Sequence, residues 1–526
     1  MHTNFHFIDG LIIVVYLVIL SAIGFYFSRR QKGIEDFFLA RHSMAWFPVG
    51  LSLMAALNSG IDYIMQPSTI AKYGIIFLSG TASWLVLYPW VAYVTLPFFR
   101  RLNLYTVYEY LERRFDVRVR SLAAGIFILW RLGWLATAMY APCLAVKVAT
   151  NGQLQVLPMI IVLGSVVTLY TMLGGIKAVI WTDVIQFCIM FGGLAATVVI
   201  VVMNVPGGAP EIWHTAANAG KLSLSTNIPG MATAGLFQKA LFFLKEPATV
   251  FGIIVAAIVG RMAGYTCDQV MIQRFQTTRS VKDSRRSFVI NAIGDAFWMF
   301  GLGFVGLSLF AYFGHHPLPA GSNPDDILPY FISTVFPAGA VGLVIAAIFA
   351  ASLSSIDSAI NSCTSVIVVD FYNRLFLKTH LGTSDLSSES QRTQIRVSRF
   401  ATLGIGVLGI ILAANVGRIG PLIKIANVVI QLFTGPLLGL YLLGMFTKRA
   451  RSEGALIGGI AGAGMSAYVA FGTKIGFIWP TVFGLATTLV VGYAVSLMAG
   501  PPVKSQGGLT FKSVMSLPET PEAGQP

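Results

Sequence analysis

Residues 7–27 read FIDGLIIVVYLVILSAIGFYF, a nearly unbroken run of apolar side chains. An α-helix rises about 1.5 Å per residue, so roughly 20 apolar residues are enough to cross the hydrocarbon core of a bilayer. A signal peptide has basic residues before its apolar run, whereas here the start, Met1 to His6, is uncharged and Arg29-Arg30 follow the run. We therefore predict that residues 7–28 form a membrane helix.

The composition extends this prediction to the whole chain. Of its 526 residues, 55% are hydrophobic and 11% are charged, whereas soluble proteins carry about a quarter charged residues. So few charges cannot cover a water-exposed surface, and the apolar runs predict an all-α integral membrane protein of about 13 transmembrane helices. We place them at residues 7–28, 45–72, 78–99, 117–150, 156–174, 178–203, 248–272, 287–313, 328–372, 395–414, 420–446, 453–472 and 476–498. The helices at 117–150 and 328–372 are too long for plain spans, so we expect them to tilt, break or continue beyond the bilayer.

The basic residues predict the orientation. The chain has 36 lysines and arginines and a net charge of +14. With this set of helices most of them fall on one side of the membrane, and basic loops stay on the cytoplasmic side. We expect a multi-pass protein of the plasma (cell or inner) membrane, with the N-terminus outside and the C-terminus cytoplasmic. The same distribution explains the net charge without a nucleic-acid partner.

The sequence does not predict an enzyme. The four cysteines lie in apolar segments without CxxC spacing, so neither a metal site nor a disulfide framework is indicated. The pair His315-His316 falls in an outer loop without other metal-ligating residues. A cation channel or a membrane sensor are alternatives from other classes, although a channel needs a continuous polar pore and a sensor needs an output domain.

Seven charged residues fall inside the predicted helices and away from the helix ends. An ionisable side chain in hydrocarbon costs at least about 2.5 kcal/mol. Some of the seven could form purely structural ion pairs, but together they indicate a water-filled path or a binding site. They are Asp62, Asp183, Asp268, Asp295, Asp357, Arg131 and Arg261.

A second polar feature is the hydroxyl-rich stretch AASLSSIDSAINSCT at residues 350–364. Helical spacing puts residues 351, 354, 355 and 358 on one face, with Asp357 beside it. Oxygen ligands suit hard cations. The alternative is that small hydroxyl residues only let helices approach closely.

Two helices contain residues that interrupt a helix. The sequence LNSG at 57–60 interrupts the second predicted helix, and MAG at 262–264 interrupts the seventh, five helices later. Transporters built from inverted repeats place broken helices at corresponding positions of the two halves, with the binding site at the breaks. The spacing therefore favours such a transporter.

At these residues the chain resembles the sodium:solute symporter family, over about residues 7 to 498. The resemblance is carried by GGIKAVIWTDVIQ at 174–186, YAP at 140–142, CDQVMIQR at 267–274 and the helix of Ser354-Ser355 that ends in DFY at 370–372. It implies a LeuT-type fold with a 5+5 inverted repeat. The expected parts are 1–44 (an extra helix and inner loop), 45–203 (first repeat), 204–247 (outer loop), 248–446 (second repeat), 447–499 (two further helices) and 500–526 (a disordered cytoplasmic tail).

The resemblance also implies where cations bind. The principal sodium site would use Ala55, Asn58, Ala351, Ser354 and Ser355. A second cation site, for Na⁺ or H⁺, would use Asp183, Ser354, Asp357 and Ser358. Family members usually have Ser or Thr where this chain has Asp357. We therefore expect one or two sodium ions as the coupling ions.

The expected function is Na⁺-coupled symport of a small organic solute by alternating access. The residues that match the solute site of the family are Asp62, Thr81, Arg131, Arg261, Tyr265, Asp295 and Gln431. A guanidinium binds a carboxylate through two hydrogen bonds, which favours an organic acid or acidic sugar. If Arg261 instead pairs with Asp62 or Asp295, a polyol or a modified sugar would fit. A third alternative is a zwitterion, with an arginine and an aspartate each binding one end. The expected partners are the solute, sodium ions and the lipid bilayer, with no obligate protein partner evident.

Overall fold

The computed structural model describes residues 5–28, 34–150, 152, 154–225, 228, 233–246, 248–319, 326–377, 388–418, 422–500 and 508–518. The regular elements in these ranges are all helices, with one isolated bridge between Met44 and Thr278. The first half contains α1 (Phe7–Ser28), α2 (Ile34–Leu39), η1 (Ala40–His42), α3 (Trp46–Leu57), α4 (Gly60–Tyr73), η2 (Ile75–Ser83), α5 (Trp84–Trp90), η3 (Val91–Thr95), α6 (Leu96–Leu102), α7 (Tyr108–Arg114), α8 (Val117–Ala149) and α9 (Val156–Asn204). The second half contains α10 (Gly208–Asn218), α11 (Leu236–Lys245), α12 (Val250–Cys267), α13 (Gln269–Gln276), α14 (Val281–His315), α15 (Ile327–Val335), α16 (Ala340–Val366), η5 (Ile367–Phe376), α17 (Ser388–Val416), α18 (Leu422–Phe446), α19 (Ser452–Gly472), α20 (Pro480–Met498) and α21 (Phe511–Met515).

The described helices account for the predicted number of spans. Eleven are long and apolar enough to cross a membrane, and α9 is counted among them once. Its 49 residues would be about 70 Å long as one helix, more than twice the thickness of a hydrocarbon core. Gly175 has φ 59° and folds α9 into two spans. The broken pair α3–α4 supplies one more span, which brings the total to the expected thirteen.

The two predicted helices that were too long for plain spans differ from each other, and one predicted break lies elsewhere. The segment 328–372 is not one helix, because Gly339 (φ 86°) separates α15 from α16. The stretch at 117–150 is one continuous helix of 33 residues. The break in the seventh predicted helix is not at 262–264, since Gly264 lies inside α12. It falls at Asp268, whose carboxylate accepts a hydrogen bond from the Val270 N–H (2.9 Å) and caps α13.

The segment after residue 500 is partly ordered. The aromatic ring of Phe511 in α21 stacks on Phe98, and Val514 is fully buried. Arg101 also donates to the carbonyl oxygen of Leu517 (3.2 Å). The predicted disordered tail over 500–526 is therefore wrong for residues 508–518, while 501–507 and 519–526 lie outside the described residues.

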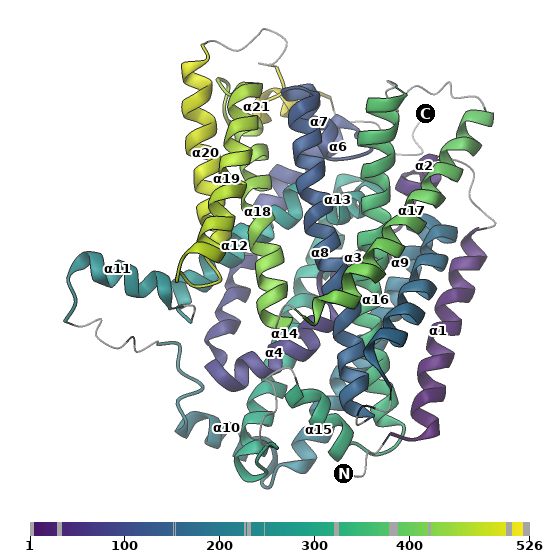
Figure 1. Cartoon of the computed structure of the whole chain (residues 1–526), viewed down its shortest axis with the longest axis vertical. Coiled ribbons are helices and arrows are strands. Elements are labelled where there is room, and N and C mark those ends of the chain that lie inside the picture. The colour runs from purple at the N-terminus through teal and green to yellow at the C-terminus, as the bar shows by residue number, and fades with distance from the viewer. Residues whose placement is uncertain are drawn as a thin grey trace.

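The helix α16 lies at the centre of the bundle, and its neighbours fix where its polar face points. It packs against α9, α8, α3 and α4, with α1 on one side of the molecule and α19 and α20 on the other (Figure 1). The first helix is tied to α16 by Asp9, whose carboxylate accepts hydrogen bonds from the Gly339 and Gly342 N–H groups (2.8 and 2.6 Å). These donors are the unpaired N–H groups of a helix start. Asp9 therefore caps the helix that carries Ser354 and Ser355.

The last two spans, α19 and α20, pack through small residues. An added Cβ on Gly458 would lie 2.7 Å from both the Gly492 Cα and the Thr488 carbonyl oxygen. Gly464 of the same helix has open space around its Cα. This close contact is typical of membrane helices that associate through small residues.

We predict that Gly458→Leu forces α19 and α20 apart and destabilises the protein by about 1–3 kcal/mol, the usual cost of overpacking. The measurement is the midpoint of thermal unfolding in detergent. Gly464→Leu is the matched control and should leave the midpoint nearly unchanged. Equal effects of the two substitutions would contradict the close packing described here.

Candidate functional site

The break between α3 and α4 exposes backbone oxygens toward α16. In a continuing helix the Ser59 N–H would bond to the Ala55 carbonyl, but here it donates to the carboxylate of Asp62 (2.7 Å). The Ala55 carbonyl oxygen instead accepts a hydrogen bond from Ser354 Oγ (2.9 Å). Asp62 therefore caps α4 and frees a backbone oxygen for the site.

The five residues of the expected sodium site meet at this break. Ser354 Oγ also donates to the Ala351 carbonyl (3.0 Å), and Ser355 Oγ lies 3.5 Å from the Asn58 carbonyl oxygen. All five residues are buried. The cluster offers three backbone carbonyls and two hydroxyls, the type of oxygen donor that hard cations take.

Gly60 lets the break approach α16 closely. A Cβ at this position would collide with Ser352 Oγ and lie 2.6 Å from the Ile348 carbonyl oxygen. Only a residue without a side chain fits there. The short distance between the carbonyl oxygens of the α3–α4 break and the hydroxyl oxygens of α16 therefore depends on Gly60.

The residues of the expected second cation site also lie together, but an arginine that the sequence analysis did not single out lies among them. Arg274 looked like part of a basic inner segment, yet its side chain is 1% exposed. Its guanidinium contacts the Asp183 carboxylate (2.9 Å), Ser52 Oγ (2.8 Å) and Ser358 Oγ.

Asp357 completes this second cluster. Its carboxylate accepts a hydrogen bond from Tyr170 OH (2.9 Å) and lies 3.2 Å from Ser358 Oγ. Asp183 and Asp357 are fully buried, and one Asp183 oxygen has no hydrogen-bond partner among the described residues. Two carboxylates against one guanidinium leave one negative charge when both are ionised.

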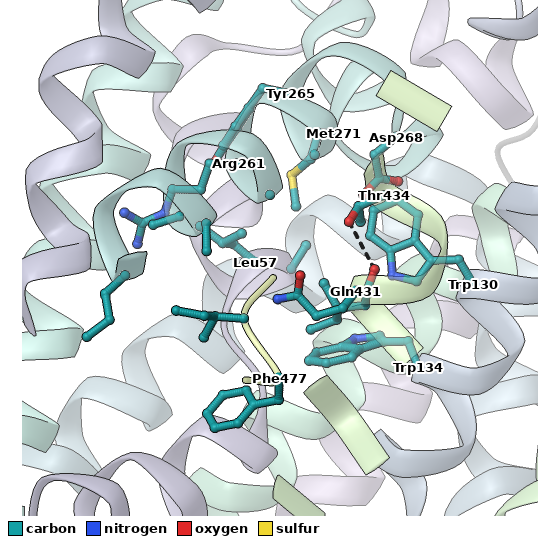
Figure 2. A pocket seen from close by; sticks show the side chains of 18 of the residues that line it. Leu57, Trp130, Trp134, Arg261, Tyr265, Asp268, Met271, Gln431, Thr434 and Phe477 are labelled. Atoms are coloured by element: carbon teal, nitrogen blue, oxygen red, sulfur yellow. Dashed lines mark hydrogen bonds between the residues drawn. The ribbon is translucent and has the colours of Figure 1, made fainter. Parts of the chain in front are cut away.

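A cavity of about 370 Å³ lies beside the first break (Figure 2). Four of the seven residues expected to bind solute line it: Arg131, Arg261, Tyr265 and Gln431. The rings of Trp130 and Trp134 form one side in this view, and Arg261 lies on the opposite side. The remaining lining is mainly apolar and includes Leu57, Phe77, Ile253, Met271, Met299, Ile430, Phe477 and Ile478.

The other three expected solute residues do not line the cavity. Asp62 caps α4, as described above, and Thr81 Oγ1 donates to the Leu78 carbonyl within its own helix (2.6 Å). Asp295 is buried behind Arg261 and accepts a hydrogen bond from Trp84 Nε1 (2.8 Å). Trp130 and Trp134 were not expected at the cavity, since aromatic residues on a membrane helix also fit a lipid-facing side. Asp268 was expected only as an embedded charge, and it also lines the cavity.

Both arginines of the cavity already have a carboxylate partner. Arg131 pairs with Asp268, and Arg261 pairs with Asp295 (2.8 Å) and lies over the Trp84 ring. The second pair is one that the sequence analysis had left open. Among the described residues, Arg131 Nε and Gln431 Oε1 have no hydrogen-bond partner, although both are shielded from solvent. These two groups remain for a solute.

We predict that Arg261→Gln destabilises the protein by about 3–5 kcal/mol, because it leaves the Asp295 carboxylate buried without its counter-charge. The double variant Arg261→Gln/Asp295→Asn should recover most of this loss. Thermal unfolding in detergent, analysed as a double-mutant cycle, measures the coupling. A double variant as unstable as Arg261→Gln would show that the pair is not the cause.

Comparisons with known proteins identify relatives of the whole chain. A family model described as the sodium:solute symporter family matches residues 37–462. The sodium/sialic acid symporter SiaT of Proteus mirabilis is 31% identical over 93% of this chain and 94% of its own. The sodium-coupled monocarboxylate transporter 1 of Homo sapiens is 31% identical over 89% of this chain and 74% of its own. These relatives are transporters and not enzymes.

Solved structures give the same picture. A Na⁺-coupled sialic acid symporter in a substrate-bound outward-open state has a TM-score of 0.82 at 30% identity and covers 94% of this chain and 99% of that one. The nucleobase-cation-symport-1 transporter Mhp1 in a closed conformation has a TM-score of 0.54 at 13% identity, covering 88% of this chain and 94% of that one. The second likeness concerns the fold alone. The all-α transporter fold implied by the sequence is thereby confirmed.

Proposed function

Since the chain belongs to the sodium:solute symporter family, we propose that it couples the entry of a small organic acid to the entry of Na⁺ by alternating access. The observation that carries this proposal is the contact between the Ser354 and Ser355 hydroxyls and the carbonyls of Ala55 and Asn58. It joins a broken helix of the first five-helix unit to α16 of the second. A cation held between the two units can favour one arrangement of them over another.

The energetics of coupling follow from this placement. Bound Na⁺ adds attraction across the contact between the α3–α4 break and α16, and the cavity begins beside that break at Ala56 and Leu57. Coupling is reciprocal, so the factor by which Na⁺ tightens solute binding equals the factor by which solute tightens Na⁺ binding. The membrane potential adds about 2.3 kcal/mol per charge per 100 mV to inward movement.

The cavity favours a carboxylate with a largely apolar body. Arg131 Nε and the Gln431 amide offer donors, as do the two indole N–H groups, whereas Gln431 Oε1 is the unpartnered acceptor. A carboxylate needs donors only, while each sugar hydroxyl buried without a partner costs about 1–3 kcal/mol. Two relatives are named for solutes with a carboxyl group, sialic acid and monocarboxylates. The apolar lining favours the simpler organic acid.

We also propose a second cation at the cluster of Asp183, Ser354, Asp357 and Ser358. The uncompensated negative charge supports it, because a net charge in the membrane interior is costly. Arg274 already contacts Asp183 and Ser358. The cation would therefore lie toward Asp357.

For the orientation we propose that the N-terminus is outside and the C-terminus cytoplasmic, in the plasma (cell or inner) membrane. In Figure 1, α1 begins near the lower end of the bundle and α20 ends at the upper end. The asymmetry of Lys and Arg supports the upper end as the cytoplasmic one.

The test of the sodium site is solute uptake by purified protein in liposomes under an inward Na⁺ gradient. We predict that Ser355→Ala raises the half-saturating Na⁺ concentration about tenfold or more, because one oxygen ligand is lost. The matched control is Ser365→Ala on the same helix, whose hydroxyl donates to the Ser362 carbonyl of that helix (2.8 Å) and has no other partner among the described residues. Uptake that ignores the Na⁺ gradient in the unmodified protein would overturn the proposed function.

The solute site has a separate test. Arg131→Lys keeps the charge beside Asp268 but removes the planar fork and its Nε donor. We predict a rise in the KM of a carboxylate solute of about tenfold, with the half-saturating Na⁺ concentration little changed when solute is saturating. An unchanged KM would rule out Arg131 as the carboxylate contact.

A further inference from the structure

A groove of about 720 Å³ runs between α18 and α20, at the end of the bundle where both helices terminate. Its walls are apolar and include Leu443, Phe446, Leu489 and Leu497, and its mouth carries Lys448 and Arg449. Val490 in the wall is 68% exposed. The groove therefore opens sideways, toward the space that lipid fills, and lies away from the cavity beside the α3–α4 break.

The turn that carries the two basic residues is held in place from inside. Arg114, fully buried, donates to the carbonyl oxygens of Gly444 (3.0 Å), Thr447 (2.7 Å) and Ala450 (3.4 Å). These carbonyls belong to the end of α18 and the residues that follow it. One guanidinium thus binds the backbone on both sides of residues 448 and 449 and fixes the turn, and both of these side chains are exposed.

Acidic residues near this turn are engaged elsewhere. Glu453 pairs with Arg451 (3.4 Å) and Asp116 pairs with Arg118 (2.7 Å), whereas Lys448 and Arg449 are exposed and make no ion pair among the described residues. Two adjacent unpaired cations at the mouth of an apolar groove match the chemistry of a phosphate group with hydrocarbon chains. Basic pockets between helices on the cytoplasmic side are known to bind such headgroups.

We propose that an anionic phospholipid binds here, with its phosphate at Lys448 and Arg449 and its acyl chains along the α18–α20 groove. The Tyr493 ring, also in the lining, suits the boundary between headgroup and chains, where tyrosine is enriched. The lipid contacts α18, at the end of the second expected repeat, and α20, which follows that repeat in the chain. This site is independent of the solute and of Na⁺.

The test uses full-length protein in detergent micelles titrated with phosphatidylglycerol, with retained lipid counted by native mass spectrometry and the thermal midpoint followed in parallel. We expect phosphatidylglycerol to bind and raise the midpoint. Lys448→Gln and Arg449→Gln should each weaken binding about fivefold, since each basic residue near a membrane surface contributes an attraction of that size. Lys474→Gln is the matched control, because this exposed charge lies in the loop at the opposite end of α19 and α20.

Four results would overturn the proposal. Phosphatidylcholine that binds and stabilises as well as phosphatidylglycerol would show that the charge plays no part. Phosphatidylglycerol binding that is unchanged in the double variant Lys448→Gln/Arg449→Gln would place the lipid elsewhere. So would a loss of binding in Lys474→Gln as large as in Lys448→Gln or Arg449→Gln. A stabilisation reproduced by inorganic phosphate or glycerol phosphate alone would identify a site for a soluble anion and not for a lipid.

Discussion

A membrane interior offers no water to an unpaired backbone group, so a broken helix is tolerated only where other atoms satisfy the broken turn. The structure meets this requirement at two points, after Leu57 and after Cys267. At the first break, the Asp62 carboxylate accepts the hydrogen bond of the Ser59 N–H. The Ala55 carbonyl is then available to accept a hydrogen bond from Ser354 Oγ. At the second, Asp268 caps α13. These two breaks determine how α16, the cavity and the cation-binding oxygens are arranged.

Buried arginines satisfy the carboxylates that this arrangement requires. Arg131, Arg261 and Arg274 each pair with an aspartate. Removing one partner of a buried pair costs more than the pair contributes, so these residues are sensitive to substitution whether or not they touch solute. The cavity carries no net charge from its two pairs, and its preference for an anion comes from donors left over after pairing.

The sequence predicted the spans well because hydrocarbon demands long apolar runs, and the residues around Ser354 were found because their type and helical spacing suit a cation. Other features depend on contacts that a single sequence does not display. Arg274 follows a helix break and looks like a loop residue in the sequence, yet its side chain is buried and pairs with Asp183. The capping role of Asp62 could have been predicted locally, since a serine three residues before an acidic residue is typical of a helix start. The short helix α21 is recognisable only by the surface it covers.

The contact of Asp9 with the start of α16 has a mechanical consequence. The first helix precedes the broken pair α3–α4 in the chain, yet the Asp9 carboxylate accepts hydrogen bonds from the backbone of the helix that carries Ser354 and Ser355. These two hydrogen bonds hold the start of α1 to the start of α16. The first helix of the chain is thus bonded to the helix at the centre of the bundle, so loss of the Asp9 carboxylate would leave the start of α16 without its cap.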